Sequence, residues 1–351
     1  MRAFRYQTLP GRVVFGPGSA HRALVSEVDD LGTRVLLITT KRAEPLATEL
    51  AMPLGERVVG VFAEVQEHVP QEIAEAARTA VHEARADCML SIGGGSVVGT
   101  AKAVAVEARL PIVAVPTTYS GSEMTPTWGL TVGGRKRTGR SPHARPRSVL
   151  YDPELTTTLP PGITAASGMN ALAHCVGACY LPDTDPITEL LAVEGVRALA
   201  AGLSEAVREP DDLDARGDAL YGAYLAGTAL AAVGPATQHR ICHVLGGAYG
   251  LPHGPTHAVL LPYVAALVEA DRPDALRKVA DVLGALRAAD GLRELAERIG
   301  APTSLAELGM PADDLDDAAR LVAAQVPAAE AVAHELLRVA YDGRWTEWTP
   351  G

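Results

Sequence analysis

Cysteine is scarce in this chain, with four residues in 351. None of the four lies in a CxxC spacing, and all stand in apolar or helical contexts: Cys88, Cys175, Cys179 and Cys242. A disulfide framework is therefore not expected. The preferred interpretation is buried free thiols in a reducing compartment.

Long apolar runs and blocks of like charge are absent as well. No stretch reaches the roughly eighteen consecutive apolar residues that cross a bilayer, and residues 1–6 lack the apolar core of a secretion signal. The formal net charge of −11 disfavours nucleic acid and anionic membranes as partners, because their phosphates would be repelled. We expect a cytoplasmic globular protein that binds neither.

The sequence has no internal repeat and no low-complexity segment, and its length suggests two domains. Its first part alternates β-rich runs with amphipathic helices, which is typical of a parallel sheet covered on both faces. The expected strands span residues 34–39, 57–62, 87–92 and 111–115. Pro70 opens the helix between the second and third strands.

Beyond residue 155 the β-branched runs disappear, and alanine- and leucine-rich segments of helical periodicity continue to the end. The last helix is expected to begin near Pro327 and to end at Gly343. The sequence thus predicts an α/β dinucleotide-binding domain with a parallel sheet at 1–155 and an all-helical domain at 156–351. The active site is expected between them.

The dinucleotide fingerprint GxGxxG and the P-loop are both missing, yet a glycine-rich turn, Ser91-Ile92-Gly93-Gly94-Gly95-Ser96, separates a strand from a helix. Backbone N–H groups at such a helix start attract a pyrophosphate. The alternative is a tight turn without a ligand.

The last of the four expected strands leads into a hydroxyl-rich loop, residues 116–126, at the carboxyl edge of the sheet, where open α/β sheets bind ligands. A solvated turn is the alternative.

The basic run at 133–147 holds six Lys or Arg and no acid. Such cations could bind a phosphate or carboxylate. We expect most of this run to be an exposed loop, with Lys136 as its functional member.

A carboxylate is missing where a metal site would need one. Asn170 and His174 share one helix face, as do His239 and His243, and the segment 252–257 adds His253 and His257. Had residue 170 been Asp, three imidazoles and a carboxylate would make a plausible divalent-metal site. Single core histidines are usually structural, but this grouping favours one shared polar pocket.

These motifs resemble the iron-containing, group III alcohol dehydrogenases, and within them the maleylacetate reductase branch. The resemblance is carried by GGGS, PTTYSGSEMT, GMNALAHCV, HRICHVLGG and LPHGPTH, and it covers nearly the whole chain. It implies the fold of dehydroquinate synthase and the iron alcohol dehydrogenases, hydride transfer from a nicotinamide cofactor, and a homodimer.

The resemblance also implies roles for individual residues. The expected cofactor-binding residues are Gly94, Gly95, Ser96, Thr117, Thr118, Ser122, Lys136 and Thr39. Metal-dependent members use one Asp and three His, whose positions fall here on Asn170, His174, His239 and His253. The branch resembles this chain in carrying Asn there and in working without metal, so we expect none. Any adventitious zinc would be held by the three histidines.

The expected reaction is reduction of an activated C=C bond in a small anionic keto acid, maleylacetate, to give 3-oxoadipate. A nicotinamide would deliver hydride to the β carbon and an acid would protonate the α carbon. His243 and His253 are the candidate catalytic residues, and the substrate would be bound by Asn170, His174, His239 and Tyr119. We expect NADH, with NADPH tolerated, because no acidic residue follows the first strand before Glu44.

Three alternatives remain open: a metal-dependent alcohol or aldehyde reductase using iron or zinc, a biosynthetic homologue acting on another unsaturated acid or imine, and an inactive binding subunit. The chain also departs from the branch pattern at two places. Gly177 stands where Glu is usual, and Val326-Pro327-Ala328-Ala329 replaces a loop rich in Pro and Arg. These departures bear on the substrate more than on the cofactor.

Overall fold

The computed structural model describes residues 4, 6, 11–133 and 135–348. The chain forms two compact units, one ending at Thr158 and the other formed by the residues from Leu159 onward together with Phe4 and Tyr6. We call the first the α/β unit and the second the helical unit. The predicted fold class, a parallel α/β part followed by a helical part, is confirmed.

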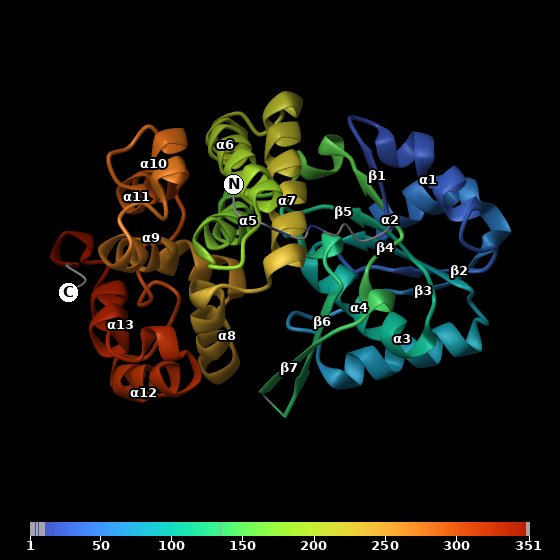
Figure 1. Cartoon of the computed structure of the whole chain (residues 1–351). Coiled ribbons are helices and arrows are strands. Elements are labelled where there is room, and N and C mark those ends of the chain that lie inside the picture. Colours follow the sequence, from blue (N-terminus) through green and yellow to red (C-terminus); the bar gives the residue numbers. More distant parts are fainter. Residues whose placement is uncertain (1–3, 5, 7–10, 134, 349–351) are drawn as a thin grey trace. The chain divides into compact units, whose positions relative to one another are not determined.

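The α/β unit is built on six parallel strands in the order β1-β8-β5-β4-β2-β3 (Figure 1). These strands are β1 (Arg12–Phe15), β2 (Val35–Ile38), β3 (Val58–Phe62), β4 (Cys88–Gly93), β5 (Ile112–Pro116) and β8 (Ser148–Tyr151). The four predicted strands are confirmed as β2 to β5. Both β1 and β8 were missed: β1 has only two half-buried residues between two exposed ones, and β8 directly follows the basic run.

Helices cover both faces of this sheet, as the alternation of elements predicted (Figure 1). They are α1 (Ser19–Asp29), α2 (Glu44–Ala51), α3 (Gln71–Glu83) and α4 (Gly95–Ala108). Pro70 precedes α3 as expected, and the buried stripe of that helix is Ala74, Ala77 and Val81. The fully buried Asp152 ties β8 to the start of α1, since its carboxylate accepts from the N–H groups of Gly18 at 2.9 Å and Ala20 at 3.0 Å.

A two-stranded antiparallel ribbon lies outside the main sheet and corrects the prediction of a basic loop. Strand β6 (Thr127–Val132) pairs with β7 (Arg135–Arg140), so much of the basic run is strand. The β-branched and aromatic residues of β6 favour this pairing. Gly139 also leaves room for Trp128, because a Cβ there would lie 2.7 Å from the indole. Lys136 lies on this ribbon and is exposed.

Nine α-helices make up the described part of the helical unit, which contains no strand. They are α5 (Pro161–Tyr180), α6 (Pro186–Arg208), α7 (Leu213–Val233), α8 (Thr237–Tyr249), α9 (His253–Asp271), α10 (Arg277–Leu283), α11 (Ala288–Arg298), α12 (Leu315–Gln325) and α13 (Ala333–Asp342). The last helix begins later than predicted, since Pro327–Ala329 is a separate 3-10 turn. Gly343 ends it with a φ of 70°, as expected.

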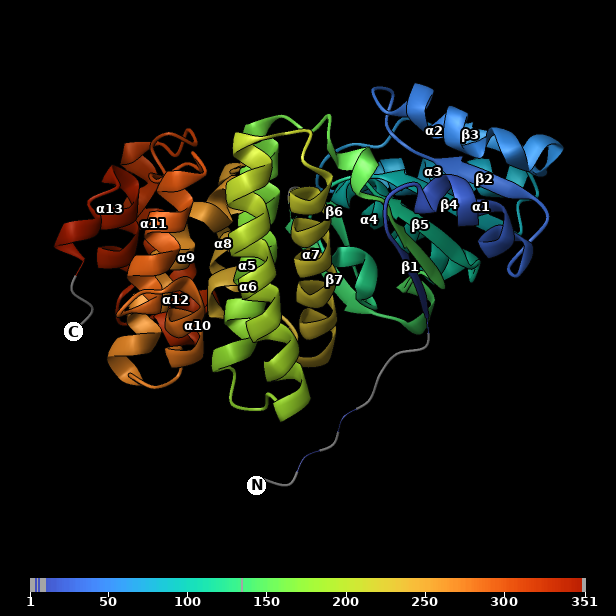
Figure 2. The ribbon, with the colours of Figure 1, turned by 90° about the horizontal axis from the view of Figure 1, so that it is seen from above.

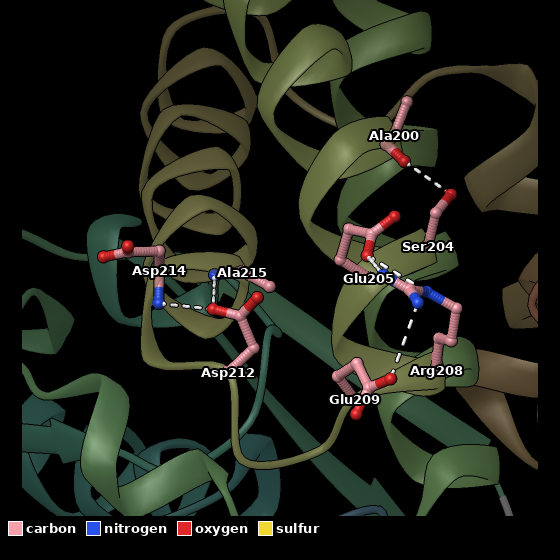
Figure 3. A network of polar contacts seen from close by, with 8 residues as sticks. All are labelled: Ala200, Ser204, Glu205, Arg208, Glu209, Asp212, Asp214 and Ala215. Atoms are coloured by element: carbon pink, nitrogen blue, oxygen red, sulfur yellow. Dashed lines mark hydrogen bonds and ion pairs between the residues drawn. The ribbon is translucent and has the colours of Figure 1, made fainter.

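Helices α5, α6 and α7 lie side by side (Figure 2). Glycine permits their close approach, because a Cβ on Gly202 of α6 would lie 2.5 Å from the backbone nitrogen of Ala219 in α7. Where α6 ends, Arg208 forms ion pairs with Glu205 and Glu209, and Asp212 then caps α7 through two backbone N–H groups (Figure 3). These contacts fix the turn between the two helices.

Within the described residues no single helix is long and apolar enough to span a membrane. The pair α7 and α8 together has the length and composition to do so, but the two helices are bent by 96°.

Candidate active site

The glycine-rich turn and the hydroxyl-rich loop are in contact in the α/β unit. Thr117 donates its backbone N–H to the carbonyl of Gly93 at 3.0 Å. A Cβ on Gly94 would lie 3.0 Å from Thr118 Cγ2, and one on Gly95 would lie 3.3 Å from Ser120 Cβ. Glycine at both positions lets the loop approach the backbone closely, because a Cβ at either would make a tight contact with a loop side chain.

This pair of segments sits at the topological switch point of the sheet. After β2 the chain moves outward to β3, whereas after β4 it moves the other way to β5. Helix α4 begins there at Gly95, so its first N–H groups face the carboxyl edge, where a diphosphate binds in folds of this class. In the hydroxyl-rich loop, the Oγ atom of Ser122 is buried without a hydrogen-bond partner. These features fit a dinucleotide.

The residues of the α/β unit that are expected to bind ligands differ in how deeply they are buried. Gly94, Gly95, Ser96, Thr117 and Thr118 are half-buried along the turn and loop. Thr39 and Tyr119, in contrast, are fully buried. The Thr39 hydroxyl donates to the carbonyl of Ile92 at 2.9 Å, and the Tyr119 hydroxyl donates to Thr156 at 3.2 Å. Both hydroxyls therefore already have partners within the α/β unit.

Five histidines from three helices converge in the helical unit, as the spacing predicted. The ring of His239 is central, with centroids 4.5 Å from His243, 4.5 Å from His257, 4.8 Å from His174 and 5.1 Å from His253. We call these five residues the imidazole cluster. Helix α5 supplies His174, helix α8 supplies His239 and His243, and helix α9 supplies His253 and His257.

Helix packing explains why the cluster forms. A Cβ on Gly254 would lie 2.9 Å from the carbonyl oxygen of Ala166, so glycine lets the first turn of α9 approach α5. Asn170 lies one turn before His174 on α5 and is only 6% exposed. The amide thus shares a buried helix face with the first imidazole of the cluster.

Burial keeps the inner rings neutral. It lowers the pKa of His174 to about 3, with a further contribution from His243. It also places the pKa values of His239 and His257 well below the ordinary range, and neighbouring histidines add to the effect. These three imidazoles are therefore uncharged at neutral pH. His243 and His253 are only half-buried.

Gln238 fixes the tautomer of His257. Its amide nitrogen donates to the carbonyl of His257 at 3.2 Å and lies 3.5 Å from the sulfur of Cys242. Its amide oxygen, 3.0 Å from His257 Nδ1, therefore accepts a hydrogen bond from that nitrogen, which carries the ring proton. The other ring nitrogen, Nε2, then carries the lone pair, and it is buried without a hydrogen-bond partner, as is Nδ1 of His239. The cluster thus contains two buried ring nitrogens, His239 Nδ1 and His257 Nε2, that make no hydrogen bond.

The cluster has the ligand type of a metal site but includes no carboxylate. In the described part of the chain, His239, His253 and His257 place one nitrogen each within 4.8 Å of one another. This set contains His257 where the sequence comparison suggested His174. Imidazoles suit zinc and similar ions. The set holds no carboxylate to neutralise a dication, and Asn170 offers only an amide.

One residue of the site, Gln238, was missed in the sequence, and the departure noted at Gly177 has a structural reason. Gln238 carried no spacing signal, because its role depends on contact between α8 and α9. The glycine at position 177 has a structural reason: a Cβ there would lie 2.8 Å from the Cβ of Ala236, just before α8. A Glu at this position requires a different approach of the two helices.

Comparison with known proteins matches both parts of the chain to one family. Residues 10–153 match the model of iron-containing alcohol dehydrogenases, and residues 164–334 match the C-terminal model of the Fe-containing alcohol dehydrogenase family. A maleylacetate reductase of Burkholderia cepacia is 45% identical over 349 residues, which cover 98% of this chain and 99% of that protein.

Solved structures agree with this match. The crystal structure of maleylacetate reductase from Agrobacterium tumefaciens superposes with a TM-score of 0.92 at 43% identity, covering 98% of this chain and 99% of that one. The maleylacetate reductase of Rhizobium sp. strain MTP-10005 gives 0.91 at 44% identity with the same coverage.

Proposed function

The chain belongs to the iron-containing alcohol dehydrogenase family, and we propose that it is an oxidoreductase that reduces maleylacetate to 3-oxoadipate with a nicotinamide cofactor. The observation that carries this proposal is the imidazole cluster with Asn170 in place of a carboxylate, in a chain similar over its whole length to maleylacetate reductases. Neutral imidazoles and an amide suit a substrate that brings negative charge of its own.

NADH, held by the glycine-rich turn and the hydroxyl-rich loop, would supply the hydride for the β carbon of the conjugated C=C bond. The protein has two further tasks. Neutral donors among Asn170, His174 and His239 hold the substrate carboxylates and the enolate oxygen that develops as the hydride adds. His243 or His253, which are half-buried, then donates a proton to the α carbon. Hydride and proton together complete the reduction.

We propose that the reaction runs without a metal. Support comes from the donor set, because the imidazoles of His239, His253 and His257 include no carboxylate to balance the charge of a dication. The second candidate, a metal-dependent reductase of alcohols or aldehydes, is favoured by the same close grouping of His239, His253 and His257. A metal there would polarise a substrate carbonyl.

NADH is the proposed cofactor, with NADPH tolerated. The segment after β2 contains Thr40, Lys41 and Arg42, and Lys41 forms an exposed ion pair with Glu64 at 3.0 Å. No carboxylate follows β2 directly in the sequence, and the nearby Glu64 carboxylate is paired with Lys41, which supports tolerance of NADPH. We further propose that the protein is a cytoplasmic homodimer that binds neither nucleic acid nor membranes. Analytical ultracentrifugation tests whether it is a dimer.

The decisive experiment follows oxidation of NADH and NADPH with maleylacetate and, separately, with simple aldehydes. The protein is first dialysed against a chelator and its metal content is measured. We expect turnover of maleylacetate by metal-free protein, and a loss of at least about 100-fold in kcat for His243→Ala. Turnover of aldehydes alone, restored only by added iron or zinc, would establish the second candidate instead.

A further inference from the structure

Two buried ionisable side chains lie behind the hydroxyl-rich loop, and the proposed reaction uses neither. Lys102 of α4 is 2% exposed, and Glu123, in the 3-10 turn Ser122–Met124, is fully buried. A charge is stable inside a protein only when it is paired or hydrogen-bonded. Both residues therefore call for a structural explanation.

Lys102 joins helix α4 to the far end of the loop. Its ammonium group donates to the carbonyl of Ser122 at 2.7 Å and to the hydroxyl of Thr125 at 2.8 Å. These two acceptors flank the turn that contains Glu123. The same helix begins at Gly95 in the glycine-rich turn. Helix α4 therefore carries both the N–H groups expected to bind the cofactor diphosphate and Lys102, which holds the loop.

Glu123 joins the loop to the sheet and to the start of α4. Its carboxylate accepts from the hydroxyl of Tyr151, at the end of β8, at 2.6 Å and from that of Ser120 at 3.2 Å. Ser120 in turn lies against Gly95, where an added Cβ would be 3.3 Å from the serine Cβ. The contacts therefore run without a break from β8 to the first residue of α4.

The two charges support each other. Burial lowers the pKa of Lys102 to about 7, and the carboxylate of Glu123 opposes that shift. Burial raises the pKa of Glu123, and its hydrogen bonds together with Lys102 oppose that shift. Removing either side chain therefore leaves the other less stable in its charged form.

We propose that Lys102 and Glu123 are positioning residues for the dinucleotide site, holding residues 117–122 of the hydroxyl-rich loop against the glycine-rich turn. In this arrangement Thr117, Thr118 and Ser122 stay in register with the first N–H groups of α4. The cofactor thus meets a preformed surface, and no loop has to be ordered when it binds. The inference rests on the proposed use of a nicotinamide dinucleotide.

The test is fluorescence titration of NADH into three variants of the full chain: Lys102→Met, Lys102→Met/Glu123→Gln, and Arg78→Met. Lys102→Met should raise the Kd for NADH about tenfold, with little change in kcat at saturating NADH and in KM for maleylacetate. The double variant should bind NADH more tightly than the single one, because it leaves no unpaired carboxylate. Arg78 is the matched control, a cation paired with Glu107 near the other end of α4.

The outcomes separate this inference from the proposed function. Wild-type protein that does not bind NADH contradicts the proposed function itself. If the wild type binds NADH and both Lys102 variants, shown to be folded by circular dichroism, bind equally well, the positioning role is wrong. If Lys102→Met does not fold, the double variant decides: a wild-type Kd overturns the proposal, and a weaker Kd with unchanged KM for maleylacetate supports it.

Discussion

At the scale of single residues, the chemistry of the imidazole cluster depends on one amide. Asn170 is buried beside His174, and it is the position at which metal-dependent relatives are expected to carry a carboxylate. Asn170→Asp should raise the affinity for zinc at least about tenfold, because an anionic ligand joins the imidazoles. The same charge should raise KM for maleylacetate by repelling its carboxylates.

Isothermal titration with zinc and steady-state kinetics measure the two effects on the same preparations. Asn170→Ser is the control, since it removes the amide without adding charge. If Asn170→Asp changes neither zinc affinity nor KM, the residue serves only packing, and the explanation of the metal-free site given above is wrong.

Gln238 offers a second test at this scale. It sets the tautomer of His257, a ring that is not proposed to contact the substrate. Gln238→Leu removes the acceptor of the His257 Nδ1–H, 3.0 Å away. We expect a loss of about 1–3 kcal/mol of stability, the cost of a buried donor left without a partner. We also expect a fall in kcat with unchanged NADH affinity. Nitrogen NMR of the ring reports the tautomer directly, and an unchanged spectrum would contradict the assignment.

At the scale of elements, the contact between α5 and the start of α8 depends on a missing side chain. Gly177→Ala should destabilise the protein by about 1–3 kcal/mol, because the new methyl group meets Ala236 in a packed interior. Ala236→Gly in the same chain should restore most of the loss. Gly162→Ala, also in α5 but with no atom within 4 Å of the added Cβ, is the control and should be neutral. Thermal denaturation of the four proteins measures these differences.

Elements also show what the sequence could predict. Periodicity located β2 to β5 and α3, because long apolar runs and a proline mark them clearly. Strand β1, whose four residues are half-buried or exposed, carries too little pattern. The charged residues of β7 hid a ribbon whose pairing depends on Trp128 and the other residues of β6. The spacing of the histidines predicted their convergence. Which ring nitrogen of His257 carries the proton depends on Gln238, through a contact between helices that no local pattern contains.

At the scale of the whole molecule, the Lys102–Glu123 pair gives the stability of the folded state a characteristic pH dependence. Glu123 has a pKa raised above its ordinary 4.5, so its contribution to stability is complete below that pH and is lost as pH rises through the raised value. Lys102 has a pKa lowered from 10.5 to about 7, so between these values the unfolded chain binds a proton that the folded chain does not. Stability therefore rises with pH across that window.

These two effects give opposite slopes on the two sides of neutrality. Relative to Lys102→Met/Glu123→Gln, the wild type should be least stable near neutral pH and gain stability toward both acid and alkaline pH. The slope on each side can reach at most about 1.4 kcal/mol per pH unit. Urea denaturation of both proteins at about pH 5, 7 and 9 measures the difference. If the stability of the two proteins changes with pH in the same way, the pair titrates identically in the folded and unfolded chains. That result would contradict the pKa shifts that burial gives to Lys102 and Glu123.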